Sequence, residues 1–152
     1  MPNVIFSYLY RDASNNKNGG GVIFTNPTGL DLESIHGRLS AVLDEREFFV
    51  PHQVRVPPVY HYLTGYGYAE DDDHSYHEFT GVTFTDEDPT DEYTRTIIEF
   101  LFEIEREARR GWQEFDDLMR LGISYAEATR LVALGPEHPE YEQALSMAVL
   151  KS

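Results

Sequence analysis

The chain contains no cysteine, so disulfide bonds and thiolate chemistry are excluded. No apolar run approaches the ~18 residues of a membrane-spanning helix. The N-terminus lacks a basic stretch followed by an apolar one, so we expect no signal peptide. Basic residues are scarce: 12 Lys and Arg stand against 27 Asp and Glu, for a net charge of −15. This charge argues against direct binding to nucleic-acid phosphates or anionic membranes, and we expect a cytoplasmic protein.

The negative charge is concentrated in one stretch, residues 70–92, which we call the acidic stretch. It holds neither Lys nor Arg and contains Glu70, Asp71, Asp72, Asp73, Glu78, Asp86, Glu87, Asp88, Asp91 and Glu92. Unpaired carboxylates are costly to bury, so residues gathered this densely are expected to face water or to meet a cationic partner. With 41% hydrophobic and 13% aromatic residues, the chain still has enough apolar surface for a folded core.

The first 90 residues have the pattern of a small sheet and one helix. Segments 4–10, 22–25 and 79–85 are rich in β-branched and aromatic residues and predict strands, with a shorter one at 48–50. The polar segment 11–21, which ends in three glycines, predicts a long loop between the first two strands. Over 31–44, Asp31 is a candidate N-cap and apolar residues recur at three- and four-residue spacing, which predicts a helix.

The sequence from Asp91 onward predicts helices. An apolar stripe over 97–108 ends at Gly111, and a second helix is expected over 112–121. Ser124 and Glu127 match a capping box, and Pro139 suits the first turn of a last helix. The sequence therefore predicts an α+β fold, in which a small antiparallel sheet packs on one helix and three to four helices follow. We expect an α+β unit at 1–90 and a helical region at 91–152, packed as one compact protein.

Aromatic and acidic residues are interleaved at the start of the acidic stretch. Tyrosine beside carboxylate can hold Arg and Lys through cation–π contacts and charge-assisted hydrogen bonds. The alternative is that these rings fill the core. The candidate partner-binding residues are Asp71, Asp72, Asp73, Tyr66, Tyr68 and Tyr76.

The polar loop near the N-terminus is a second candidate site. Backbone N–H groups of glycine-rich loops can bind phosphate. This loop precedes a strand and lacks Gly-Lys-Ser/Thr, so it is no P-loop, and a long hairpin turn is the alternative. The candidate ligand residues are Tyr10, Arg11, Asp12, Asn15 and Lys17.

Three histidines, His61, His74 and His77, lie near the acidic residues. A divalent metal would bind here if the imidazoles and loop carboxylates converged. Their spacing matches no known ligand pattern, and in a strand His74 and His77 would point to opposite faces. We therefore expect exposed polar side chains here, and no metal or other cofactor.

Part of the chain resembles a set of short uncharacterised bacterial proteins. The resemblance covers residues 4–92. Members of that set carry an aromatic residue at the position of Asn16 and one glycine where this chain has three. The resemblance implies a compact α+β unit in a bacterial or phage-related cytoplasm, and it implies no activity. The matching motifs are Tyr10-Arg11-Asp12-Ala13 with Asn15 and Lys17, Val22-Ile23-Phe24, Asn26-Pro27, Leu32-Glu33, Phe48-Phe49, Val56-Pro57, His77-Glu78-Phe79 and Pro89-Thr90-Asp91.

These observations favour a non-enzymatic interaction protein that docks on a basic surface of another protein. A nucleic-acid-handling complex, inhibited or regulated by charge mimicry, is the expected type of partner. No nucleophile and base can be paired from the sequence, which does not decide whether the protein is an enzyme. The alternatives are a metal- or ligand-dependent enzyme that uses loop 10–17 with the three histidines, and a structural subunit that self-associates through its C-terminal helices.

Overall fold

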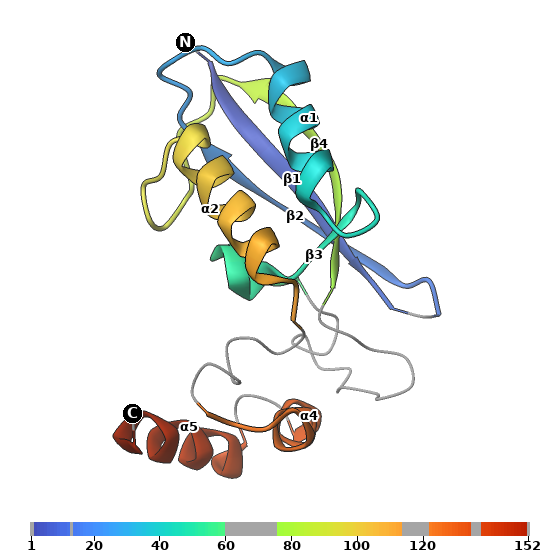
Figure 1. Cartoon of the computed structure of the whole chain (residues 1–152), viewed down its shortest axis with the longest axis vertical. Coiled ribbons are helices and arrows are strands. Elements are labelled where there is room, and N and C mark those ends of the chain that lie inside the picture. Colours follow the sequence, from blue (N-terminus) through green and yellow to red (C-terminus); the bar gives the residue numbers. More distant parts are fainter. Residues whose placement is uncertain (1, 13, 60–75, 114–121, 135–137, 152) are drawn as a thin grey trace.

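The computed structural model describes residues 2–12, 14–59, 76–113, 122–134 and 138–151. These residues form an antiparallel sheet and several helices, which confirms the α+β class (Figure 1). The elements are β1 (Asn3–Arg11), β2 (Lys17–Phe24), α1 (Leu32–Val42), β3 (Phe48–Phe49), the 3₁₀ helix η1 (Pro51–Val54), β4 (His77–Thr85), α2 (Ile97–Arg110), α4 (Tyr125–Leu134) and α5 (Pro139–Lys151).

The sheet has the strand order β2-β1-β4-β3, with β1 in its interior. Helices α1 and α2 lie against the same face of this sheet (Figure 1). Side chains of β1 alternate between buried and half-buried, as expected for a strand with one covered face. The core lies between that face and the two helices. The strands, which all lie within residues 1–90, therefore share one hydrophobic interior with α2.

Aromatic rings form the centre of the core. The Phe6 ring lies 5.4 Å from Phe49, 5.4 Å from Phe79 and 5.0 Å from Phe100, measured between centroids. Phe24 stacks on Phe100 at 4.4 Å. Rings at these separations gain contact energy beyond their buried area, so strands far apart in sequence are joined to α2 through one aromatic cluster.

The glycines of the first hairpin belong to a strand, so the prediction of a loop over 11–21 is wrong. β2 begins at Lys17 and pairs with β1 without interruption, from Arg11 opposite Lys17 to Val4 opposite Phe24. A Cβ at Gly20 would lie 2.9 Å from Cγ1 of Val59 and 3.6 Å from the Tyr8 ring. Glycine at this position therefore leaves room for these two side chains while β2 pairs with β1. A run of three glycines is otherwise typical of a loop.

A β-bulge lets β4 supply two residues to the core. Phe79 and Val82 are three apart, so simple alternation would place them on opposite faces. The register against β1 shifts between Ser7 and Tyr8, opposite Gly81, whose φ is 155°. As a result both Phe79 and Val82 pack on the core.

Both helices of the core begin at side-chain caps. Asp31 accepts a hydrogen bond from the Ser34 N–H at 2.7 Å, which confirms the predicted N-cap of α1. The cap of α2 is a full capping box between Thr96 and Glu99, a signal that the sequence reasoning missed. Gly111 ends α2, as predicted.

The predicted helices at the C-terminal end are present as α4 and α5. Ser124 accepts from the Glu127 N–H at 3.2 Å, as expected for its position, and Pro139 is the first residue of α5. Most of the helix predicted over 112–121 falls outside the described residues. Among the helices that the structure does describe, none has the length and apolarity needed to cross a membrane.

Candidate protein-interaction site

The described part of the acidic stretch contains two kinds of carboxylate. Glu78, on β4, accepts from Arg11 of β1 at 2.9 Å. Asp91 is buried and accepts from Arg95 at 2.8 Å. These two residues meet arginines of the same chain and contribute to the fold itself, so they are not hydrated carboxylates that await a partner protein.

Four other carboxylates, which we call the acidic loop, remain exposed to solvent. None of them forms an ion pair in the part of the chain that the structure describes. Glu87 accepts a hydrogen bond from a neutral group, the Thr85 hydroxyl, at 3.4 Å. The members of the acidic loop are Asp86, Glu87, Asp88 and Glu92.

The backbone of this loop is tied to the sheet by hydrogen bonds. Thr90 N–H donates to the Ile23 carbonyl at 3.0 Å, and Ile23 N–H donates to Thr90 Oγ1 at 2.9 Å. At the other side, the Asn3 side-chain amide donates to the Glu87 carbonyl at 2.9 Å. These hydrogen bonds hold the segment that carries the four charges against the sheet, beside the end of β2.

A buried arginine anchors the C-terminal end of the loop. Arg95, which is 5% exposed, donates to both oxygens of Asp91, to Glu103 and to the carbonyls of Val54 and Arg55. Its guanidinium lies 5.2 Å from the centre of the Phe100 ring. Since every donor direction has a partner, Arg95 joins the acidic loop, η1 and α2 into one structure.

Asp91 shows the electrostatic result of this arrangement. Burial by itself would raise the pKa of its carboxyl, because the charged form loses hydration. The hydrogen bonds donated by the Arg95 side chain and backbone have the opposite effect and prevail, so the pKa of Asp91 lies below its ordinary value. Asp91 is thus ionised in the folded protein near neutral pH.

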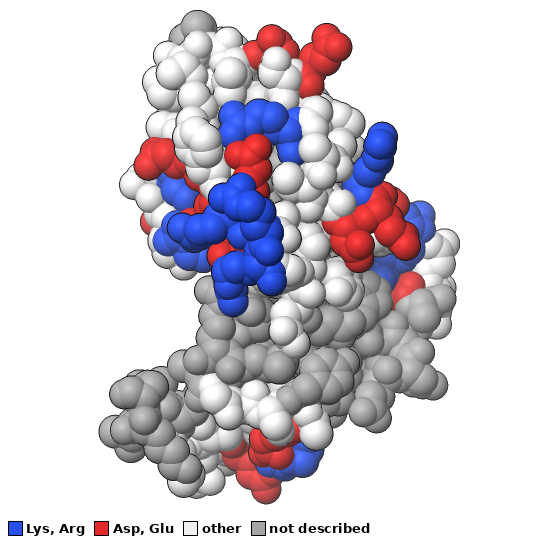
Figure 2. Space-filling view, viewed as in Figure 1, with Lys and Arg blue, Asp and Glu red and all other residues white. Residues whose placement is uncertain are grey.

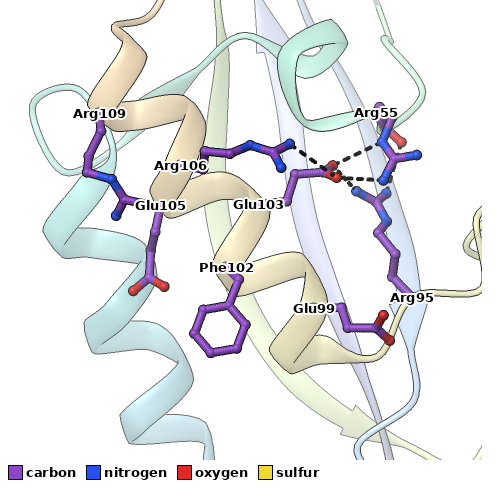
Figure 3. Close-up of a pocket in the computed structure, with 8 residues that line it drawn as sticks. All are labelled: Arg55, Arg95, Glu99, Phe102, Glu103, Glu105, Arg106 and Arg109. Carbon is purple, nitrogen blue, oxygen red and sulfur yellow. Dashed lines mark hydrogen bonds and ion pairs between the residues drawn. The ribbon is translucent and has the colours of Figure 1, made fainter.

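Most arginines around α2 are likewise matched with acids. Glu103 accepts from Arg55 at 2.5 Å and from Arg95 at 2.5 Å, and Figure 3 shows the side chain of Arg106 directed toward the same carboxylate. The hydrogen bond that Arg55 donates to Glu103 raises the pKa of Arg55. On the neighbouring helix, Arg38 pairs with Glu105 at 2.6 Å.

A hollow of about 470 Å³ lies beside α2 among these residues. Figure 2 shows the cationic side chains gathered over this part of the molecule, with acidic side chains between them. Arg55 and Arg95 share the single carboxylate of Glu103, so the cations and anions of this face are interleaved in one hydrogen-bonded network. The residues lining the hollow are Arg55, Arg95, Glu99, Phe102, Glu103, Glu105, Arg106 and Arg109.

Of the predicted partner-binding residues, only one lies in the described part of the chain. Tyr76 is half-buried and immediately precedes β4. Asp71, Asp72, Asp73, Tyr66 and Tyr68 all fall outside the described residues. The acidic loop belongs to the same acidic stretch of the sequence but contains none of the six predicted partner-binding residues.

The predicted ligand loop is a closed turn. Asp12 accepts from the Asn16 backbone at 2.8 Å and from its side chain at 3.0 Å. Tyr10 is fully buried, and the guanidinium of Arg11, next to Asn15, also binds β4. Lys17 is exposed at the first position of β2. The five residues thus have different surroundings and do not line a common hollow among those found in the described structure.

His77 is a core residue, so the expectation of an exposed side chain is wrong. It is 0% exposed on β4, and its Nε2 accepts from the Val59 N–H at 3.0 Å. His61 and His74 lie outside the described residues. Within the described ranges, no group of three or more potential ligands is placed to hold a metal ion.

Comparison of the chain with protein-family models, with curated proteins and with solved structures found no match. The chemical features of the described surface therefore carry the functional argument.

Proposed function

We propose that this chain is a non-enzymatic interaction protein whose acidic loop docks on a basic surface of another protein. The observation that carries the proposal is the set of four exposed carboxylates on a backbone tied to the sheet, none of them in an ion pair within the described structure. Holding like charges together is unfavourable, and a cationic partner removes that cost.

The distribution of the remaining charge supports the same proposal. Most of the arginines around α2 pair with acids of this chain, whereas the acidic loop has no such partner in the described part. Long-range attraction would therefore be dominated by the net charge of −15 and would favour basic proteins. In the sequence, Asp71, Asp72 and Asp73 extend the same acidic stretch.

The natural target is a nucleic-acid-handling protein or complex in the cytoplasm, because its binding surface is already shaped for a row of negative charges. Occupation of that surface would inhibit or regulate the complex. The contact would form rapidly and weaken as salt rises, since exposed charges are screened beyond about 8 Å at physiological ionic strength.

The test compares two variants of equal net charge. In the first, the four residues of the acidic loop are changed to Asn or Gln. In the second, four exposed acids elsewhere are changed to Gln: Glu33, Glu45, Glu47 and Glu142. Each tagged protein is used to capture partners from the native host, followed by elution with increasing salt.

We expect the wild type and the second variant to retain the same partner, and the loop variant to lose it. An equal loss of capture in both variants would show that only the total charge matters, which contradicts a role specific to the acidic loop. Capture by the loop variant with unchanged salt dependence would contradict the proposal.

A further inference from the structure

The outer edge of β2 has backbone groups that point away from the sheet. Because β2 is the edge strand, only its inner side pairs with β1. Ile23 donates to and accepts from Thr90, so its N–H and carbonyl face outward. Orientation alternates along a strand, and the N–H and carbonyl groups of Lys17, Gly19 and Gly21 therefore face outward too.

These three residues form an exposed edge that is ready for pairing. All three are exposed, and their outward groups have no hydrogen-bond partner in the described structure. Protein sheets usually protect an edge with proline, a bulge or several charges. Between Lys17 and Val22 there is no proline, the register is uninterrupted, and Lys17 is the only charged residue. The three glycines also leave no side chain to obstruct an approaching strand.

We propose that an extended segment of a basic partner protein adds to this edge as a further strand, beside Lys17–Gly21 of β2. The inference rests on the proposed function and names how the partner binds. Backbone hydrogen bonds to Gly19 and Gly21 supply the attachment, as in other strand-addition complexes. The acidic loop supplies the preference for a cationic partner.

The position of the acidic loop determines where the partner's charges lie. Thr90 closes the edge at Ile23, so the end of a strand paired with Gly21 lies beside the segment that carries the acidic loop. Lys17 lies at the opposite end and disfavours a cation there. The added segment therefore carries Lys or Arg at its end next to Ile23. A second copy of this chain is disfavoured as the occupant, because each copy carries a net charge of −15.

The test uses a labelled peptide, Lys-Arg-Thr-Val-Thr-Val-Thr-Ser, whose basic end meets the acidic loop when it pairs antiparallel to β2. Binding is followed by fluorescence anisotropy, and amide hydrogen exchange is measured at Gly19 and Gly21. We expect saturable binding and slower exchange at both amides. The matched peptides carry Glu-Glu in place of Lys-Arg, or N-methyl groups at the positions that face β2, and we expect each to bind at least tenfold more weakly.

Two substitutions at one position provide the control in the protein. Gly19→Pro removes an outward N–H that is not used in pairing with β1, and proline is tolerated on an edge strand when its nitrogen faces solvent. Gly19→Ala retains the N–H, and its Cβ would come no closer than 3.9 Å to the Tyr8 carbonyl. We expect Gly19→Pro to weaken binding at least tenfold and Gly19→Ala to change it less than twofold.

The outcomes separate this inference from the proposed function. If the N-methylated peptide and Gly19→Pro bind as well as their controls, strand addition is overturned, while salt-sensitive binding lost in the loop variant would still support docking on the acidic loop. If the Glu-Glu peptide binds equally well but Gly19→Pro abolishes binding, strand addition stands and charge recognition fails. Absence of saturable binding to the wild type overturns the inference.

Discussion

The face of α2 and the acidic loop are neighbours in sequence and both are densely charged, yet they use charge differently. Around α2, arginines and glutamates meet at hydrogen-bond distance, as in the Arg55–Glu103 pair. In the acidic loop, four carboxylates share a fixed backbone and none has a cation within the described structure. Charge density alone therefore does not distinguish a stabilising network from a binding surface, whereas the placement of the opposite charges does.

Charges in the two regions also contribute differently to the free energy of unfolding. Removing one member of a buried pair leaves its partner unpaired in a poorly hydrated site, which is strongly destabilising. Removing an exposed, unpaired charge changes the free energy of unfolding very little. Substitutions in the network around α2 should therefore lower stability, whereas substitutions in the acidic loop should weaken binding.

The largest effect is expected for Arg95→Met. The substitution retains much of the volume but leaves Asp91 and Glu103 without the guanidinium that they share. We expect the free energy of unfolding to fall by about 3–5 kcal/mol, measured from the midpoint of urea denaturation.

Arg109→Met is the matched control, because Arg109 is exposed and forms no ion pair within the described part of the chain. A change of less than about 0.5 kcal/mol is expected there. Similar losses in both variants would mean that the burial and pairing of Arg95 contribute little beyond what an exposed arginine contributes.

A smaller effect on the free energy of unfolding is expected when the pH is lowered. The pKa of Asp91 is lower in the folded protein than in the unfolded chain. Its contribution to stability is therefore complete above the unfolded pKa of about 3.9, and it is lost as pH falls through the folded pKa. The free energy of unfolding should decrease with falling pH below about 4 in the wild type, and this slope should be shallower in Asp91→Asn.

The pH series also tests the proposed contrast. Asp88→Asn, in the acidic loop, removes a carboxylate that has no ion pair in the described structure, so its acid slope should remain close to that of the wild type. If both variants lost the same part of the slope, Asp91 would not have a special role in linking the loop to Arg95.

The smallest effect on stability is expected from neutralising the acidic loop. The variant in which Asp86, Glu87, Asp88 and Glu92 become amides should unfold within about 0.5 kcal/mol of the wild type, or be slightly more stable because repulsion is reduced. Thermal and urea midpoints measure this. A large loss of stability would show that these carboxylates are structural, and it would remove the contrast with α2.

Several local features were predictable because neighbouring residues determine them. The N-cap at Asp31, the apolar stripe of α2 and its end at Gly111 follow from short-range geometry. The capping box at Thr96 and Glu99 was equally readable but was missed. The strand through the three glycines could not be recognised from composition, because it depends on pairing with β1 and on the close approach of Tyr8 and Val59 to Gly20.

The candidate site was predictable only in outline. The absence of Lys and Arg over residues 70–92 identified the acidic stretch. It did not separate Asp91, which is buried against Arg95, from Asp88, which is exposed. Asp91 and Arg95 are four residues apart, a spacing compatible with pairing, but the burial that gives the pair its importance comes from α2 and η1.

By itself, the sequence determined the α+β class, the helix caps and the excess of negative charge, because composition and spacing within a few residues are sufficient for these. Tertiary structure alone decided which charges are paired, that His77 is buried, and that the outward groups of Gly19 and Gly21 lie at an open edge. The physical reason is that burial and strand pairing are made by segments far apart in the chain, and the energy of a charge or a backbone group depends on what those segments bring beside it.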